Sequence, residues 1–218
     1  GIWLASLSVV EKPGGLRQDA ERQSLKGILR QPAVIAFFAV SFFLQLSHGP
    51  YYTFFSIYLD AQDYSRSLIG GLWSLGVIAE VLLFLFMHRL LARYSLRGIV
   101  LWSLGLSALR WLLIAYFVEH AAVLVLAQCL HAASFGSFHA AGIEVIRHWF
   151  TGHHGQGMAM YSGLSFGLGG AAGALLSGWG WDISAQQCFV AAAAAAIIAY
   201  IVAWFWFDVK AEPEAALE

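Results

Sequence analysis

The sequence predicts an all-α integral membrane protein, a bundle of six transmembrane helices. Of its 218 residues, 60% are hydrophobic and 11% are charged, and the mean hydropathy is +0.69. An ordinary globular domain carries about 25% charged residues, so the surface of this chain cannot be mostly water-facing. Six apolar stretches, each long enough to cross a bilayer, supply the helices. The formal net charge of −1 gives no basic excess, and no nucleic-acid partner is expected.

The chain divides into four parts. Residues 1–10 form a short apolar segment that we interpret as the end of a preceding transmembrane helix. Residues 11–31 are a polar connecting loop, residues 32–209 hold the six-helix unit, and residues 210–218 are a tail. From the apolar runs and their breaks, the six spans are expected at Ala33–Leu59, Leu68–Leu91, Gly98–Val118, Ala121–Phe150, Gly157–Trp181 and Cys188–Phe207. The short connections make consecutive spans antiparallel.

Lysine and arginine gather on one side of this predicted bundle. Ten of the 12 basic residues belong to that side, namely Lys12, Arg17, Arg22, Lys26, Arg30, Arg89, Arg93, Arg97, Arg147 and Lys210. The opposite side holds Arg66, beside Asp60 and Asp63. Because positively charged loops remain in the cytoplasm, the basic side and both ends of the six-helix unit are expected to be cytoplasmic.

Three ionisable residues lie near the middle of three different spans: Glu80, Arg110 and His131. Counted from the outer ends of their spans at 1.5 Å per residue, they lie at depths of about 12 to 18 Å. An ionised side chain at that depth costs about 3 kcal/mol on insertion scales, so such residues usually mark an ion or substrate pathway. The sequence therefore predicts a charged site inside the bundle.

Two structural interpretations remain open beside the functional one. Glu80 and Arg110 could form a buried ion pair that only fixes the helix register. His131 could be a core histidine held by one neighbouring hydrogen bond. In the functional interpretation Glu80 exchanges a proton, because burial and the distance to Arg110 together set its charge state.

Helical spacing places further polar and aromatic residues beside these three. Gln45, His48 and Tyr52 share one face of the first span, Tyr51 is adjacent, and Gly49-Pro50 is expected to kink the helix there. On the second span, Trp73, Val77 and Glu80 share a face, and on the third span Ser103, Ser107 and Arg110 do so. On the fourth span the shared face holds Gln128, His131, Phe135 and His139. Trp111 follows Arg110 directly. Aromatic rings around a guanidinium suit a small aromatic carboxylate, and neither a metal site nor a cofactor is expected.

The fifth span is rich in glycine. Gly163 and Gly167, and likewise Gly169 and Gly173, are four residues apart. This spacing lets two helices approach closely. We expect this helix to pack tightly against a neighbour, with a bending, gating helix as the alternative.

Short stretches around these residues carry a resemblance to a known family. They are Ser47-His48-Gly49-Pro50-Tyr51-Tyr52 with Ile57-Tyr58, Leu72-Trp73-Ser74-Leu75-Gly76-Val77 with Ala79-Glu80-Val81, Leu109-Arg110-Trp111, and Leu130-His131. In this order and spacing the chain resembles the C-terminal half of a major facilitator superfamily transporter, and within it the bacterial 3-phenylpropionate permease group. That group is related to lactose permease and to nucleoside–proton symporters.

The resemblance implies a twelve-helix protein made of two six-helix halves, with residues 11–31 as its central cytoplasmic loop. Substrate would lie between the halves and reach each side by alternating access. Glu80, Arg110 and His131 fall where lactose permease carries the glutamate, arginine and histidine of sugar recognition and proton coupling. The chain departs from that pattern at Ser134, where lactose permease has a second glutamate. The loop Met87–Tyr94 lacks the acidic residue of the superfamily motif.

The predicted function is proton-coupled symport of a small aromatic carboxylate such as 3-phenylpropionate across a bacterial inner membrane. Its expected partners are substrate, protons, membrane lipid and the N-terminal six-helix half. Proton coupling is assigned to Glu80, His131 and Arg110, and substrate binding to Arg110, Gln45, His48, Tyr51, Tyr52, Trp73, Trp111, Gln128, Phe135 and His139. A nucleoside or sugar symporter is the alternative. A self-contained intramembrane enzyme or sensor domain is a remote one, because no nucleophile with a partnered base is evident.

Overall fold

The computed structural model describes residues 24–209, and these fold into helices joined by short connections. The expectations for residues 1–23 and 210–218, including the end of a preceding helix and the tail, lie outside the described residues. Within the described part the helical elements are α2 Leu25–Leu29, α3 Pro32–Ser47, α4 Gly49–Asp60, α5 Arg66–Arg93, α6 Leu96–Phe117, α7 Ala121–His131, η1 Ala132–Gly136, α8 Ser137–Trp149, α9 His154–Ser162, η2 Gly163–Gly169, α10 Gly170–Trp181 and α11 Ala185–Trp206, of which η1 and η2 are π-helical.

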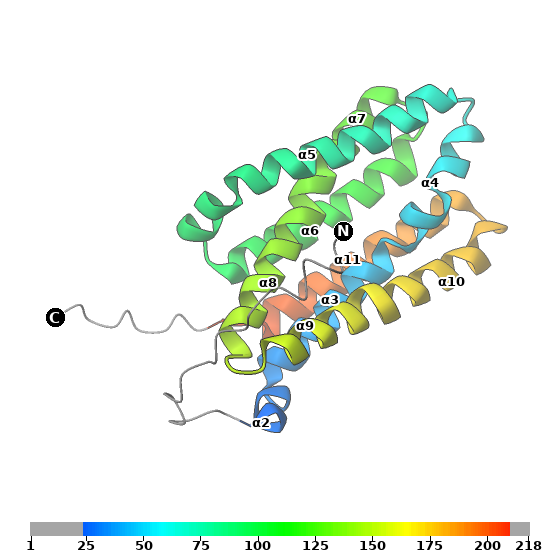
Figure 1. The fold of residues 1–218 in the computed structure, drawn as a ribbon. Helices are drawn as coiled ribbons and strands as arrows, with labels where there is room; N and C mark the ends of the chain where they lie inside the picture. The colour runs from blue at the N-terminus through cyan, green and yellow to red at the C-terminus, as the bar shows by residue number, and fades with distance from the viewer. Residues whose placement is uncertain (1–23, 210–218) are drawn as a thin grey trace, which may run out of the picture.

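These elements form six helices long and apolar enough to cross a membrane. They run over Pro32–Asp60, Arg66–Arg93, Leu96–Phe117, Ala121–Trp149, His154–Trp181 and Ala185–Trp206. The expected spans agree with them to within three residues, the largest difference being at the starts of the last two spans. The all-α, six-helix prediction is confirmed. In Figure 1, α5 lies along one edge of the bundle and α9–α10 along the other, with the remaining spans between them.

The helices begin where the sequence supplies capping side chains. Ser65, Ser95 and Ser184 precede α5, α6 and α11, and each hydroxyl accepts a hydrogen bond from a backbone N–H in the first turn. The first N–H groups of a helix have no partner within it, and a serine cap satisfies one of them. Serines in polar turns therefore fix the point at which three of the spans start.

The buried core consists of two apolar clusters with polar side chains between them. On the first span, Leu44 belongs to one cluster and Tyr51 to the other. On α6 the corresponding pair is Leu104 and Trp111, and on the fourth span it is Phe138 and Ala127. Between the clusters lie buried polar residues, which we call the central polar layer: Gln45, Ser47, His48, Ser107, Arg110, Gln128, His131 and Ser134.

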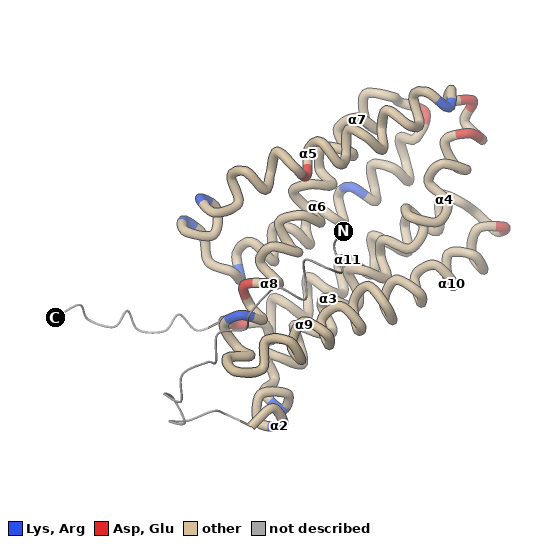
Figure 2. The backbone as a smooth tube through the Cα atoms, in the orientation of Figure 1, with Lys and Arg blue, Asp and Glu red and all other residues tan. Residues whose placement is uncertain are grey.

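Charged residues collect at the two ends of the bundle (Figure 2). Arg89 and Arg93 end α5, and Arg97 begins α6 at the same end. Asp60 and Arg66 flank the α4–α5 turn at the other end. Figure 2 also shows an acidic residue in the middle of α5 and a basic one within the bundle, so charge also lies far from both ends.

Candidate functional site

The first span is broken at His48, as the Gly49-Pro50 pair predicted. α3 ends at Ser47, α4 begins at Gly49, and the backbone N–H of His48 donates to Gln45 O at 3.1 Å. Proline has no N–H and cannot continue the hydrogen-bond ladder of a helix. The break leaves the His48 side chain fully buried at the centre of the bundle, in the central polar layer.

Arg110 is the buried cation of this layer and has an exposed fraction of 0%. Its Nε donates to Ala127 O at 3.0 Å. Its guanidinium carbon lies 4.1 Å from the centre of the Tyr51 ring and 4.4 Å from that of Trp111. Within the described residues, both terminal nitrogens lack a hydrogen-bond partner. Arg110 can therefore offer a planar pair of N–H donors, the geometry that matches a carboxylate.

Arg110 does not pair with Glu80. Over residues 24–209 the ion pairs are Glu119 with His120 and Glu144 with Arg147, on side chains that are exposed except for the half-buried Glu144. The register-fixing ion pair considered from the sequence is therefore absent from the described part of the chain. An unpaired charge buried in a protein costs roughly several kcal/mol, even after the surrounding structure has relaxed around it. A ligand anion would supply the missing partner.

Tyr51 and Gln128 join α4 to α7 beside this cation. The Tyr51 hydroxyl donates to Gln128 Oε1 at 2.8 Å, and both side chains are buried. The Gln128 amide nitrogen is left without a partner among residues 24–209. Ser47 Oγ accepts from Trp111 Nε1 at 3.1 Å, which fixes the second ring against Arg110.

Two histidine rings complete the centre of the layer. The rings of His48 and His131 lie 6.1 Å apart, and His48 also contacts Trp111 at 4.8 Å. In the described structure neither His48 Nε2 nor His131 Nδ1 has a hydrogen-bond partner. The site therefore presents a cation, an amide and two imidazole nitrogens with unused hydrogen-bonding capacity.

A stack of rings leads away from this centre. His131 stacks on Phe135 at 5.2 Å with 7° between the planes, and Phe135 on His139 at 6.4 Å with 5°. The π-helical η1 lies between the two histidines. In its wider turn, side chains four residues apart lie more nearly on the same face of the helix than they do in an α-helix. His139 Nδ1 then lies 3.3 Å from Tyr161 Oη, so His139 faces α9 at the far end of the stack.

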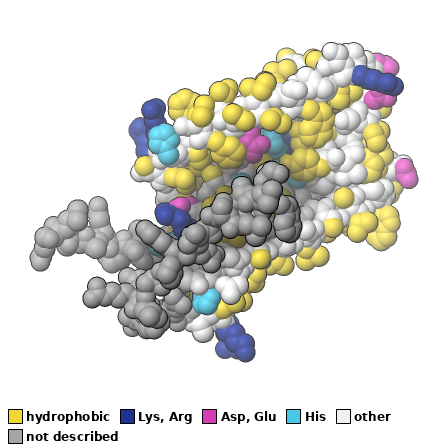
Figure 3. All heavy atoms as spheres, in the orientation of Figure 1, with side chains coloured by type: hydrophobic (Ala, Val, Ile, Leu, Met, Phe, Trp, Pro, Cys, Tyr) yellow, Lys and Arg dark blue, Asp and Glu magenta, His cyan; other side chains and the backbone are white. Residues whose placement is uncertain are grey.

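Glu80 lies on a more open face of the bundle and is half-buried. It packs against Gly136 of η1, where an added Cβ would lie 3.2 Å from Glu80 Cγ. Few of the side chains of α5 are buried, since its span has one of the smallest buried shares of the six. Figure 3 views this face and shows acidic and histidine side chains together in the hollow between α5 and α9–α10.

The structure thus gathers most of the predicted site residues and separates three of them. The gathered set is His48, Tyr51, Tyr52, Trp73, Arg110, Trp111, Gln128, His131 and Phe135. Glu80 lies on the open face and His139 at the end of the ring stack. Gln45 belongs to the central polar layer, but it lines a neighbouring cavity of about 260 Å³ with Tyr52 and Phe166.

Comparison with known proteins identifies the family. Residues 1–191 match the model of the MFS_1 like family, which is most of the chain. The chain belongs to this family. The chain is 37% identical over 110 residues to the "Probable 3-phenylpropionic acid transporter" of Escherichia coli, a match that covers 50% of this chain and 29% of that protein. It is 25% identical over 150 residues to the "Uncharacterized transporter YwbF" of Bacillus subtilis, covering 68% of the chain and 37% of the relative.

The matched segments therefore cover well under half of the length of these relatives. No solved structure matches it. The MFS_1 like family match, relatives named as transporters and six bilayer-length helices place this chain in a family of multi-pass membrane transporters and not of enzymes. The predicted family and its resemblance to the 3-phenylpropionate permease group are confirmed.

Sequence reasoning missed two residues that border the site of this MFS_1 like chain. Phe166 of η2 contacts Phe135 at 6.1 Å and His139 at 5.6 Å, and Tyr161 of α9 holds His139. Both lie in the glycine-rich fifth span, whose pattern was interpreted as packing. The aromatic residues between its glycines were the available signal.

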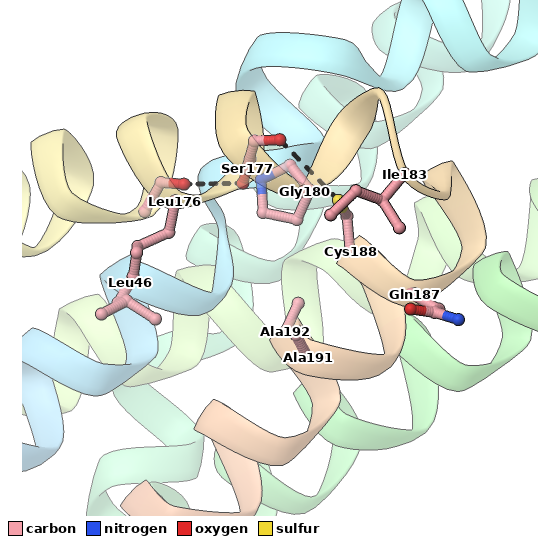
Figure 4. Close-up of a pocket in the computed structure, with 11 residues that line it drawn as sticks. Leu46, Leu176, Ser177, Gly180, Ile183, Gln187, Cys188, Ala191 and Ala192 are labelled. Atoms are coloured by element: carbon pink, nitrogen blue, oxygen red, sulfur yellow. Dashed lines mark hydrogen bonds between the residues drawn. The ribbon is translucent and has the colours of Figure 1, made fainter.

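A separate crevice between α10 and α11 is shown in Figure 4 and has a volume of about 260 Å³. Its polar groups bond locally: Ser177 donates to Gly173 O at 2.6 Å, and Cys188 Sγ donates to Ser177 O at 3.7 Å. It is lined mainly by small and aliphatic residues and contains no charged side chain. We therefore place the candidate site at Arg110 and not in this crevice.

Proposed function

We propose that this chain supplies the C-terminal half of a proton-coupled symporter for a small aromatic carboxylate such as 3-phenylpropionate. The N-terminal six-helix half supplies the other wall of the binding site, and alternating access moves the site between the two sides of a bacterial inner membrane. Both ends of the six-helix unit face the cytoplasm, because the basic residues gather at that end. The membrane lipid surrounds the outer faces.

One observation carries the choice of substrate. Arg110 is fully buried, and its terminal nitrogens lack partners in the described structure. Around it stand the rings of Tyr51, Trp111 and, beyond Tyr51, Trp73. A carboxylate satisfies the guanidinium, and an aromatic tail packs against the aromatic side chains beside it. The name of the Escherichia coli relative supports the same substrate class.

The proton side of the proposal rests on Glu80 and His131. Glu80 is the single acidic residue of α5 and lies half-buried on the face that the N-terminal half would cover. It exchanges a proton with the aqueous cavity as that face opens and closes. His131 lies in the central polar layer, and it orients or relays the proton.

The test is uptake of labelled 3-phenylpropionate, driven by a pH gradient, into vesicles that contain the complete twelve-helix transporter. The Glu80→Gln variant should exchange bound substrate but fail to accumulate it, because it cannot release a proton. Glu119→Gln, which removes an exposed loop carboxylate, is the matched control and should accumulate normally. Nucleosides and sugars serve as competitors.

Three results would contradict parts of this proposal. Unimpaired accumulation by Glu80→Gln would remove Glu80 from proton coupling. Competition by a nucleoside or sugar, with none by other aryl carboxylates, would change the substrate class. Uptake by neither the parent nor the control would reject the aromatic carboxylate.

A further inference from the structure

The hydrogen bond of the His48 ring shows which of its nitrogens carries a hydrogen. His48 Nδ1 lies 2.8 Å from the backbone oxygen of Leu44, an atom that can only accept. Nδ1 must therefore carry the hydrogen. In the neutral ring Nε2 then carries a lone pair and no hydrogen. This nitrogen is buried without a partner among the residues the structure describes. His48 thus presents a proton acceptor to the central polar layer.

The groups that face this acceptor come from several elements. Tyr52 of α4, Trp111 of α6, His131 of α7 and Phe135 of η1 have ring centres 4.8 to 6.1 Å from that of His48. The charged group beside this set is Arg110 of α6, whose guanidinium carbon lies 4.4 Å from the centre of the same Trp111 ring that His48 contacts.

No acidic side chain pairs with His48 in residues 24–209. On the other side of α3, the sequences of η2 and α10 contain no titratable residue. Cys188 of α11 bonds to Ser177, and Tyr200 of α11 stacks on Trp204. Within the described residues, the acid in the middle of the bundle is Glu80, which lies on the α5 face.

We propose that His48 takes up the coupled proton when a carboxylate binds at Arg110. In the empty site, a second positive charge beside the guanidinium is opposed by repulsion in a buried, low-dielectric setting. A bound carboxylate neutralises Arg110 and removes that repulsion, so a proton from the aqueous cavity can bond to Nε2. Anion and proton together leave the net charge of the site as it was.

This inference rests on the proposed function and adds a step to it. Glu80 exchanges the proton with the cavity. His131 passes it to His48, since the His131 ring lies 6.1 Å from that of His48 and an added Cβ at Gly76 of α5 would lie 3.8 Å from His131 Cδ2. His48 then holds the proton while the carboxylate is bound. Because the proton follows the anion by electrostatics alone, coupling needs no acidic residue at Arg110.

The experiment measures proton uptake on binding, using the complete transporter in detergent, 3-phenylpropionate as the probe, and a pH-indicator dye in weak buffer. The parent should take up about one proton per carboxylate bound, and its apparent affinity should weaken as pH rises. His48→Asn should bind substrate with little proton uptake and a flat pH dependence. The Asn amide can still donate to Leu44 O but has no proton-accepting nitrogen.

His120→Asn, the same change at an exposed loop histidine, is the matched control and should behave as the parent. If His48→Asn fails to fold, His48→Gln is measured in its place, with the same expectation.

Undiminished proton uptake by the folded His48 variant would overturn the inference and leave the symport proposal intact. Binding without proton uptake by the parent would instead reject proton coupling itself. Absence of binding by the parent would reject the substrate class.

Discussion

The guanidinium of Arg110 lies over the ring of Tyr51, with 4.1 Å between the guanidinium carbon and the ring centre. A cation over an aromatic face gains about 2 kcal/mol or more when the pair is desolvated. This contact holds the charge in the bundle without a carboxylate from the described part of the chain. It leaves the two terminal nitrogens for an anion.

Replacement of Arg110 should abolish substrate recognition. Arg110→Gln removes the charge and the paired donors, and Arg110→Lys keeps the charge but loses the planar fork. Hydrogen bonds to charged groups contribute about 1.5–3 kcal/mol each. We expect Arg110→Gln to weaken binding of 3-phenylpropionate at least about a hundredfold, with Arg110→Lys in between, measured by titration calorimetry on the complete transporter. Arg66→Lys, at the α5 end, is the control, and an unchanged Kd in Arg110→Gln would place the carboxylate elsewhere.

The Tyr51 hydroxyl should contribute to the stability of the fold as well as to the site. Tyr51→Phe keeps the ring over Arg110 but leaves Gln128 Oε1 without its donor. An unsatisfied buried acceptor costs about 1–3 kcal/mol. We expect Tyr51→Phe to lower the unfolding temperature in detergent. Tyr116→Phe, whose side chain is exposed, should leave it unchanged. Equal unfolding temperatures for the two variants would show that Gln128 finds another donor.

The spans and the break in the first helix could be predicted because each has a local cause. A bilayer-length apolar run fixes a span, and Gly49-Pro50 fixes the break at His48. Arg110 and His131 lie in the central polar layer as their depth in the sequence indicated. These features follow from residues a few positions apart.

The direction that Glu80 faces could not be predicted in the same way. α5 is apolar around most of its circumference, with exposed residues such as Val77, Ile78 and Val81, so its pattern does not specify which face is buried. In the structure Glu80 faces Gly136 and not Arg110, a direction that the sequence pattern did not specify. The ring stack from His131 to His139 depends on the π-helical η1, which shifts the helix phase and which the sequence did not indicate.

Gly169 should tolerate no side chain, whereas Gly163 in the same span should. An added Cβ at Gly169 would lie 2.6 Å from the backbone oxygen of Phe42 on α3, and one at Gly163 would meet nothing within 4 Å. Of the two glycine pairs expected to pack closely, Gly169 and Gly173 do so against α3, and Gly163 and Gly167 do not. Overpacking costs about 1–3 kcal/mol. We expect Gly169→Ala to lower the unfolding temperature, measured by thermal denaturation in detergent.

Gly163→Ala is the matched control for that measurement. Replacing a helical glycine by alanine without a clash stabilises by roughly 0.5–1 kcal/mol, so its unfolding temperature should not fall. A Gly169→Ala variant as stable as Gly163→Ala would mean that α3 and η2 can separate without cost. The close approach of these two spans would then not limit stability.

Arg97 should stabilise the end of α11 from the start of α6. Its Nε donates to Phe207 O at 2.9 Å and its Nη2 to Trp204 O at 2.6 Å, carbonyls that have no helical partner beyond the last turn. Arg97→Gln removes the charge and one of the two donors, and each lost bond costs about 1.5–3 kcal/mol because its donor is charged. We expect faster amide hydrogen exchange in the last turn of α11 and a lower unfolding temperature, with Arg97→Lys intermediate.

Arg93→Gln is the control, since in the described structure Arg93 contacts the Tyr94 ring but donates to no carbonyl. In Arg93→Gln, the amide hydrogens in the last turn of α11 should exchange as fast as in the parent. Exchange confined to that turn in Arg97→Gln would identify local fraying and not a change of the whole bundle, because amides that open only locally exchange independently of global unfolding. Unchanged exchange in Arg97→Gln would mean that interfacial water replaces the guanidinium at these carbonyls.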